Sequence, residues 1–281
     1  MHFQKTSQKT RIAVYVAFVV LCFIAINNCA KNEPPVIVPD TGTPPKKHTI
    51  PYPEGYDTTS SGASAANGLG DHHYSPYFKH PDFFNMKSSH SLTIIPNFKT
   101  YQQTTEYHCG AAVALMVMYH YGITNEDELT IGKGLRTHMD PDGGPPTQLT
   151  EVGTTVGNMV RYFETRGWYV ESSLTHNPFG EANYALFRKW VIDNLREGTP
   201  IMVEWVDWGG HWQNIIGFDT MGTDHFGSDI LILADPYDTS DHYQDGYYVV
   251  NAERFFYMWF DYVYQPEGEQ IRQWVIAKPK Q

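Results

Sequence analysis

The chain has few basic residues and few cysteines. Lys and Arg total 20 against 31 Asp and Glu, a formal net charge of -11, and neither a basic patch nor a glycine-rich phosphate loop is visible. These absences argue against nucleic acid as a partner, and the acidity mainly favours solubility. Of the 3 cysteines, only Cys109 lies beyond residue 29, so the main part of the chain cannot form an internal disulfide.

Long apolar runs are also lacking. The longest, Ile12 to Ile26, is about fifteen residues, which is short for a membrane span and suits the core of an export signal. We therefore predict an export signal of the lipoprotein type over residues 1–28, with Cys29 as the lipidated residue. An uncleaved membrane anchor and simple secretion are the alternatives. Each of the three predicts an exported, extracytoplasmic protein, and lipidation predicts attachment to a bacterial membrane.

Residues 29–70 are rich in Pro, Gly, Ser and Thr and contain few large apolar side chains. This composition predicts a flexible tether. Residues 71–281 contain no repeat of fixed period and are numerous enough to bury a substantial core, which we expect over about 90–265.

Cys109 stands at the start of a segment that predicts a buried helix. No polar side chain occurs from Ala111 to Met118, so the helix has no face for water, and Gly122 is a suitable C-terminal stop. The sulfur would lie at the positive end of the helix, where unpaired N–H groups and the macrodipole favour a thiolate. Two interpretations of this cysteine are open: an inert buried residue packed as a small hydrophobe, or a nucleophile.

Other residues offer the partners that a nucleophilic thiol requires: a base, a group that orients the base, and donors for the oxyanion. Gln103 lies six residues before Cys109 and can aim its side-chain N–H at a developing negative oxygen. His211 follows a glycine pair and precedes an apolar run, which is typical of the start of a strand. Asp235 ends the next apolar run, so two neighbouring strands would place its carboxylate beside the imidazole.

Three segments carry a family resemblance: YQQTTEYHCGAA, GGHWQNIIGFD and ADPYD. They resemble the glutamine, cysteine-glycine, glycine-histidine-tryptophan and aspartate-proline motifs of papain-like cysteine peptidases, and among these the double-glycine leader peptidases of bacteriocin export. The resemblance implies a papain-like fold with Cys109 as nucleophile and His211 as base. It also implies that Asp235 orients the base and that Gln103 donates to the oxyanion. His108 departs from the family, in which an aspartate or small polar residue precedes the cysteine.

The remaining patterns predict an α+β domain with helices early and strands late. Helical spacing marks the segments 110–122, 125–135, 155–165 and 181–195, with Asn125 as the cap of the second. Apolar runs predict strands at 168–174, 201–206, 212–218, 230–234, 247–250 and 274–277. We expect a helix-rich lobe packed on an antiparallel sheet lobe, with the active site in the cleft between them.

Two tryptophans flank the expected cleft. Trp208 and Trp212 lie on either side of His211 and are candidates for substrate contact, with Trp208 the more exposed. The histidines ahead of Cys109 match no tight ligand spacing, and the run DPYDTSDHYQDG lacks the alternation of a calcium loop, so we expect no metal site. We expect this acidic run to be a solvated turn.

Together these features predict a thiol hydrolase that cleaves peptide or related amide bonds through an acyl-enzyme on Cys109. Its substrate would be a peptide or protein, and no cofactor is implied. Two other function classes remain open. An acyl or peptidyl transferase would pass the same acyl-enzyme to an amine or thiol, and a binding module would keep the fold without turnover.

Overall fold

The computed structural model describes residues 45–66, 77–137, 153–179 and 183–280. The chain divides into two units, Met1–Gly42 and Thr43–Gln281, and every described residue belongs to the second. The predicted export signal and Cys29 lie outside the described residues, so export and lipidation stay predictions. None of the helices in the described ranges combines the length and the apolar character needed to span a bilayer.

In the described part of the chain, α-helices follow one another early and most strands come later. Its α-helices are α2 (Gly62–Ala66), α3 (Cys109–His120), α4 (Glu128–Leu135), α5 (Val156–Thr165), α6 (Tyr184–Arg196) and α7 (Ala252–Tyr257). Its strands are β1 (Leu92–Ile94), β2 (Tyr169–Ser172), β3 (Ile201–Trp205), β4 (His211–Asp219), β5 (Ile230–Ala234), β6 (Tyr247–Asn251) and β7 (Gln273–Lys278). The predicted helices and strands are all present, whereas α2, α7 and β1 were not predicted.

These strands form a single sheet within the described ranges, in the order β2-β7-β3-β4-β5-β6. Each pair of named strands is antiparallel. The short strand β1 pairs with the end of β4, where Leu92 lies opposite Asp219, beyond the residues of β4 that pair with β3. The predicted α+β class with an antiparallel sheet is confirmed.

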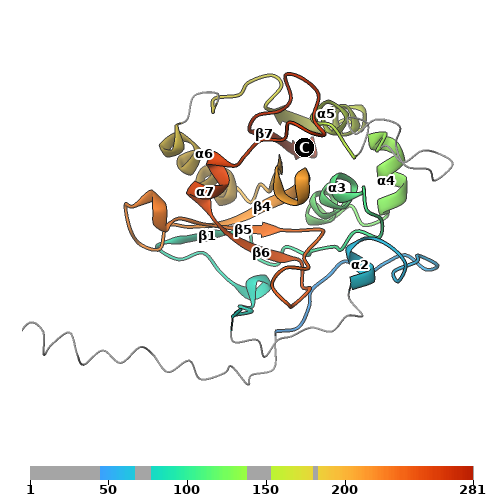
Figure 1. Ribbon diagram of the computed structural model, residues 1–281, viewed down its shortest axis with the longest axis horizontal. Helices are drawn as coiled ribbons and strands as arrows, with labels where there is room; N and C mark the ends of the chain where they lie inside the picture. Colours follow the sequence, from blue (N-terminus) through green and yellow to red (C-terminus); the bar gives the residue numbers. More distant parts are fainter. Residues whose placement is uncertain (1–44, 67–76, 138–152, 180–182, 281) are drawn as a thin grey trace, which may run out of the picture. The chain divides into compact units, whose positions relative to one another are not determined.

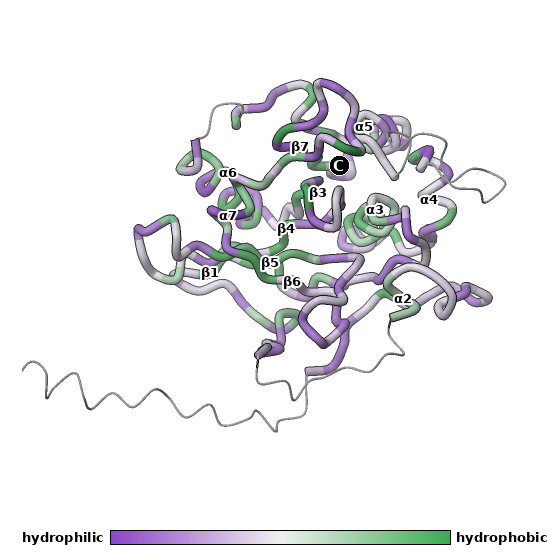
Figure 2. Tube along the Cα trace, viewed as in Figure 1, coloured by the Kyte–Doolittle hydropathy of each residue, from purple (hydrophilic) through white to green (hydrophobic). Residues whose placement is uncertain are grey.

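The helices cover the central strands. In Figure 1, α3, α4 and α5 lie together on the right of the view, and α6 and α7 lie together on the left. Both α3 and α6 contact β4, and Asn214 of β4 donates to the carbonyl of Val113 in α3 at 3.2 Å. Figure 2 shows hydrophobic residues concentrated on β4, β5 and α3. Because α3 is buried along most of its length, its first residue is held in a fixed place against the sheet.

The start of α4 differs from the prediction, because Asn125 is not its cap. Asp127 caps the helix, and its carboxylate accepts a hydrogen bond from the Thr130 N–H at 2.9 Å. Asn and Asp are comparable caps, so local preference does not decide between them. The hydroxyl of Tyr56, which is far away in the sequence, also donates to Asp127. This contact favours Asp127 as the cap.

Residues 45–66 also differ from the flexible tether that the composition predicts for 29–70. Ile50 and Ala63 are buried in the domain, and Thr49 forms an isolated bridge with Thr100. The main chain of Ser64 donates to the carbonyl of Gln103 at 3.0 Å. A few well-placed apolar and main-chain contacts therefore order this segment, although its overall composition is that of a linker.

The acidic run after Asp235 is not the solvated turn that we expected. Asp238 and Asp245 are buried, and their carboxylates accept main-chain hydrogen bonds from Gly246 at 2.8 Å and Tyr247 at 3.0 Å. Burial raises the pKa of both carboxyl groups, that of Asp245 to about 7. The run forms an internally bonded turn that leads into β6.

Candidate active site

Cys109 is the first residue of α3 and the only cysteine among the described residues, where it is unpaired. It is 8% exposed. The preceding residue, His108, makes no side-chain capping hydrogen bond to the helix. The N–H groups of the first turn therefore have no side-chain cap, and the helix dipole favours negative charge at this end.

His211 and Asp235 lie side by side, as the sequence predicts. His211 is the first residue of β4, and Asp235 directly follows the neighbouring strand β5. The imidazole Nε2 and the carboxylate Oδ1 are 2.6 Å apart, and both side chains are buried. Oδ1 also accepts from the main-chain N–H of Tyr237 at 2.8 Å, which fixes the carboxylate. With Nε2 directed at Asp235, Nδ1 is the nitrogen left to exchange a proton with Cys109.

The surroundings of His211 favour its protonated form. Burial by itself lowers the pKa of the imidazole, but the charge of Asp235 and its hydrogen bond raise it, and the contact with Cys109 raises it further. The pKa of His211 reaches about 10. The imidazole is therefore held as a cation between the thiol and the carboxylate at neutral pH.

Gln103 reaches the same site from the loop before α3. Its main-chain N–H donates to the carbonyl of Pro236 at 2.9 Å, and its side-chain Nε2 donates to the carbonyl of Thr105 at 2.7 Å. An amide nitrogen carries two hydrogens, so one remains for a further acceptor. Gln103 lines the same cavity as Cys109 and His211.

The cavity has a volume of about 220 Å³. Trp208 and Trp212 both line it, but they differ in exposure. Trp208 is 60% exposed, as predicted, and lies in a short turn with a positive φ of 52°. Trp212 is buried and donates its indole N–H to the carbonyl of Thr154 at 2.8 Å. Trp208 is thus placed to meet a ligand, while Trp212 forms part of the wall.

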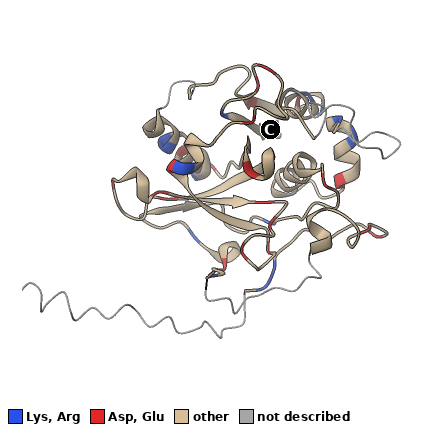
Figure 3. Cartoon of the chain, in the orientation of Figure 1, with Lys and Arg blue, Asp and Glu red and all other residues tan. Residues whose placement is uncertain are grey.

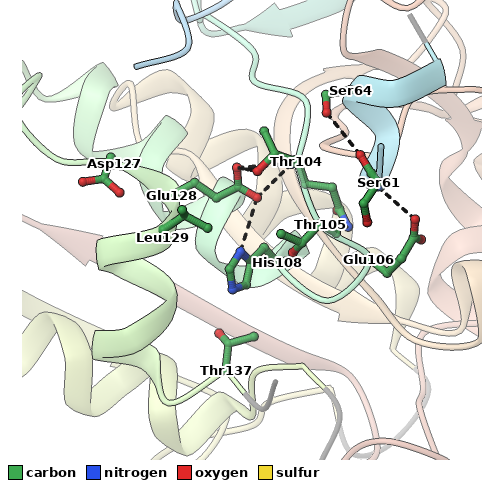
Figure 4. Close-up of polar contacts among 12 residues, drawn as sticks. Ser61, Ser64, Thr104, Thr105, Glu106, His108, Asp127, Glu128, Leu129 and Thr137 are labelled. Atoms are coloured by element: carbon green, nitrogen blue, oxygen red, sulfur yellow. Dashed lines mark hydrogen bonds and ion pairs between the residues drawn. The ribbon is translucent and has the colours of Figure 1, made fainter. Parts of the chain in front are cut away.

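A buried carboxylate that sequence reasoning missed holds the loop between Gln103 and Cys109. Glu128 is fully buried at the start of α4. Its carboxylate accepts hydrogen bonds from the main-chain N–H of Thr104 at 2.9 Å and from the Thr104 hydroxyl at 2.7 Å. It also accepts from the hydroxyl of Tyr101 at 3.0 Å. His108 Nδ1 lies 3.5 Å from Glu128 Oε1. Figure 4 shows Thr104 and His108 on two sides of this carboxylate. An acidic residue in a first helical turn is ordinary, so no sequence signal reveals this function.

The segment before residue 67 contacts the same loop from another side. The main-chain N–H of Gly62 donates to Glu106 Oε1 at 2.9 Å, and the hydroxyl of Tyr237 donates to the other oxygen of Glu106 at 3.2 Å. Figure 4 shows Ser61 of this segment next to Glu106, and Ser64 joined to Ser61. The loop that carries Gln103 is therefore enclosed by α2, α4 and the turn after β5.

Metal-ligating side chains do not gather anywhere in the described residues: no group of three or more His, Cys, Asp or Glu could hold an ion. The chemistry available at the site is that of the thiol, the imidazole and the carboxylate. Such an arrangement can form a thiolate, stabilise it with an imidazolium, and return the proton to a leaving group.

The chain is similar to a solved structure and matches a family model. The peptidase domain of Streptococcus ComA, a bifunctional ABC transporter involved in quorum sensing, is similar in structure with a TM-score of 0.41 and 19% identity. The similarity covers 65% of this chain and 99% of that domain. No curated protein matches the chain. The model of the Peptidase_C39 like family matches residues 95–266. Since this match covers more than half of the chain, the protein belongs to the Peptidase_C39 like family.

Proposed function

We propose that this protein is a cysteine peptidase that cleaves peptide or related amide bonds through an acyl-enzyme on Cys109. The observation that supports this most directly is the placement of His211. Its Nε2 lies 2.6 Å from Asp235 Oδ1, and Cys109, which lines the same cavity, contributes to the raised pKa of the imidazole. Membership of a peptidase family makes a peptide the expected substrate.

In the first step, the Cys109 sulfur attacks the carbonyl carbon of the substrate, and a C–S bond forms as the C=O becomes an oxyanion. Gln103 and the main-chain N–H of Cys109 donate to this oxygen. The imidazolium of His211 then gives its Nδ1 proton to the leaving nitrogen, and the C–N bond breaks. Asp235 stabilises the imidazolium and keeps the ring in one orientation throughout.

In the second step, a water molecule attacks the thioester. His211 Nδ1 accepts a proton from this water, the C–S bond breaks, and the carboxylic acid product leaves. The thiolate and the imidazolium are then restored. A buried His211 whose pKa is about 10 serves as acid in the first step and regains that state after the second.

The pH dependence of alkylation of Cys109 by iodoacetamide tests this proposal, because no substrate needs to be known. The full chain is used, and modification is followed by mass spectrometry of the peptide that contains Cys109. A neighbouring imidazolium favours negative charge on the sulfur, so at pH 6 the wild type should react about tenfold or more faster than His211→Ala. His225→Ala, which removes an exposed histidine, is the control and should behave as the wild type.

Equal, slow alkylation in the wild type and His211→Ala would contradict the proposal, since the histidine would then have no effect on the thiol. Where a cleavable peptide is found, Cys109→Ala should abolish turnover. The leaving-group proton disappears when His211 loses its charge, so turnover should also fall as the pH rises through about 10.

We further propose that the peptidase acts outside the cytoplasm, attached to the membrane by a lipid on Cys29. The support is the sequence alone: a short apolar stretch after three basic residues, followed by the cysteine. Growth with a labelled fatty acid should label the wild type but not Cys29→Ala. Labelling of both proteins, or of neither, would contradict the lipid anchor.

A further inference from the structure

A pair of buried carboxyl groups lies beside Cys109, and the proposed mechanism gives neither a role. Glu204 is on β3, paired with Trp212 of β4 and Gln273 of β7, and it lines the cavity next to the cysteine. Asp261 follows α7 and lies close enough to Glu204 to raise the pKa of that carboxyl group. Each of the two residues is 1% exposed. A buried acidic pair so close to a reactive thiol calls for a physical explanation.

Two oxygens of this pair have no donor. Glu204 Oε2 and Asp261 Oδ2 are buried without a hydrogen-bond donor among the described residues, whereas Asp261 Oδ1 accepts from the main-chain N–H groups of Val263 at 2.7 Å and Tyr264 at 3.0 Å. Burial raises the pKa of Glu204 well above its usual range, and the neighbouring Asp261 raises it further. The pair therefore lacks a donor, and a cation placed beside it would act in a poorly screened interior.

The same cavity presents further acceptors. Within the described residues, Gln103 Oε1 and Gln265 Oε1 are buried without a hydrogen-bond donor, and both residues line the cavity. The orientation of Gln265 is fixed because its Nε2 donates to the carbonyl of Thr154 at 3.3 Å. No Lys or Arg occurs among the described residues of the cavity wall, and the imidazolium of His211, which also lines it, is paired with Asp235. Since buried acceptors are usually paired, the cavity is complementary to a group that is rich in donors.

The more exposed lining of the cavity is aromatic. The rings of Trp208 and Tyr237 have centroids 5.4 Å apart, and Tyr264 packs against Gly210, where an added Cβ would lie 2.4 Å from the ring. Aromatic faces attract ammonium groups. About 15 Å³ suffices for one water molecule, so the cavity of about 220 Å³ admits a group as large as a side chain.

We infer that this cavity is a subsite for a cationic group of the substrate, a primary ammonium bound at its buried end by Glu204, the member of the acidic pair that lines the cavity. The inference rests on the proposed function, because it concerns the substrate of the same site. An ammonium has three donors and no acceptor, which matches Glu204 and Gln265 Oε1. When it binds, Glu204 releases its proton to solvent and the ammonium pairs with the resulting carboxylate.

Charge elsewhere on the protein is consistent with this occupant. The formal net charge is -11, and Figure 3 shows basic residues mainly on the helices and acidic residues spread over many loops. A negative field raises the local concentration of cations. The expected substrate is therefore a peptide with a primary amine, on a side chain or at its amino end, close to the bond that is cleaved.

Two thiol reagents of similar size and different charge test the subsite without a substrate. The full chain is treated with 2-aminoethyl and with 2-hydroxyethyl methanethiosulfonate, and the modification rate of Cys109 is measured by mass spectrometry. The ratio of the cationic to the neutral rate is divided by the same ratio for a small model thiol, which removes the intrinsic reactivity of the reagents. We expect a preference for the cation of about tenfold or more in the wild type, and its loss in Glu204→Gln.

Glu164→Gln is the matched control, because it makes the same change in net charge at an exposed position of α5 and should keep the preference. Equal normalised rates in the wild type, or an undiminished preference in Glu204→Gln, would overturn the inference. Should Glu204→Gln not fold, protection of wild-type Cys109 from iodoacetamide decides the question. Butylammonium should then protect at a concentration about tenfold lower than butanol, and equal protection would again overturn the subsite.

Failure of the proposed function gives a different result. In that case Cys109 would react slowly with both methanethiosulfonates, and His211→Ala would leave the rates unchanged. Failure of the subsite alone would leave the effect of His211→Ala intact and abolish only the charge preference.

Discussion

The side-chain Nε2 of Gln102 donates a hydrogen bond to the main-chain carbonyl of Asp235 at 2.8 Å. The other end of the same amide accepts from the N–H of Asp238 at 3.2 Å. One buried side chain thus joins the loop that carries Gln103 to the turn that carries Asp235. Two parts of the candidate site that lie far apart in the sequence are held at a fixed separation by this amide.

Replacing Gln102 should weaken the site without removing any group proposed to react. We expect Gln102→Ala to lower the free energy of unfolding by about 1–3 kcal/mol, because it leaves buried main-chain groups unpaired. Alkylation of Cys109 at neutral pH should slow at the same time. Gln102→Met, which keeps the volume but not the hydrogen bonds, should show similar losses. Wild-type behaviour of Gln102→Met would mean that packing alone matters here.

Glu128→Gln should disturb the loop between Gln103 and Cys109. The neutral amide places an N–H group where the carboxylate accepts donors from Thr104 and Tyr101. We expect a loss of about 2–4 kcal/mol in the free energy of unfolding, measured by urea denaturation, with slower alkylation of Cys109. Glu126→Gln, the same change at a partly buried position two residues earlier, is the control. Similar losses in both variants would argue against a specific function of Glu128.

Gly62→Ala tests the contact between α2 and the loop before the cysteine. Gly62 has a φ of +64°, and an added Cβ would lie 2.5 Å from the carbonyl oxygen of Gln103. Gly55→Ala is the matched control, since it has a φ of +85° but nothing within 4 Å of the added Cβ. Backbone strain alone should lower the free energy of unfolding by about 1 kcal/mol at either position. The clash should lower it by about 1–3 kcal/mol more at Gly62 only. Equal melting temperatures of the two variants would contradict this account.

Asp245→Asn should change how stability depends on pH. The pKa of Asp245 is about 7 in the folded protein, chiefly because of burial, against 3.8 for the free side chain. Its contribution to stability is therefore complete below about pH 4 and is lost as the pH rises through about 7. Asparagine cannot ionise and keeps an acceptor for the N–H of Tyr247. We expect the free energy of unfolding of Asp245→Asn to rise, relative to that of the wild type, by about 1–3 kcal/mol when the pH is raised from 5 to 8.

Urea denaturation at the two pH values measures this gain, and Asp224→Asn, at an exposed position, is the control. A stability difference between Asp245→Asn and the wild type that does not vary with pH would show that burial of this carboxyl group is not the cause.

The parts of the site that the sequence predicts are those marked by dense apolar patterns. The apolar run after Cys109 predicts α3. The two apolar runs near His211 and Asp235 predict neighbouring strands, and because each of the two residues lies at an end of its strand, the contact between imidazole and carboxylate could be predicted. Glu128 and Glu204 could not be predicted in this way. Their importance depends on burial and on partners such as Thr104 and Asp261, which only the folded chain brings close.

Composition gives a wrong prediction for two segments, for the same reason. The run that contains Asp238 and Asp245 has the composition of a solvated turn. Its carboxyl groups are nevertheless buried, because nearby main-chain N–H groups donate to them and Gln102, from a distant loop, accepts from the N–H of Asp238. Residues 45–66 have the composition of a linker, but the contacts of Ile50 and Ala63 with the core order them. Burial is decided by tertiary contacts, and a count of residue types does not contain that information.

The packing of residues 45–66 has a practical consequence for anyone who wishes to produce the protein. The family match starts at residue 95, and a fragment trimmed to that boundary would lack Gly62 and Ser64, which bond to Glu106 and Gln103. Such a fragment would expose the outer side of the loop that leads to Cys109. The smallest unit suitable for expression therefore begins near residue 45, some fifty residues ahead of the limit that family comparison suggests.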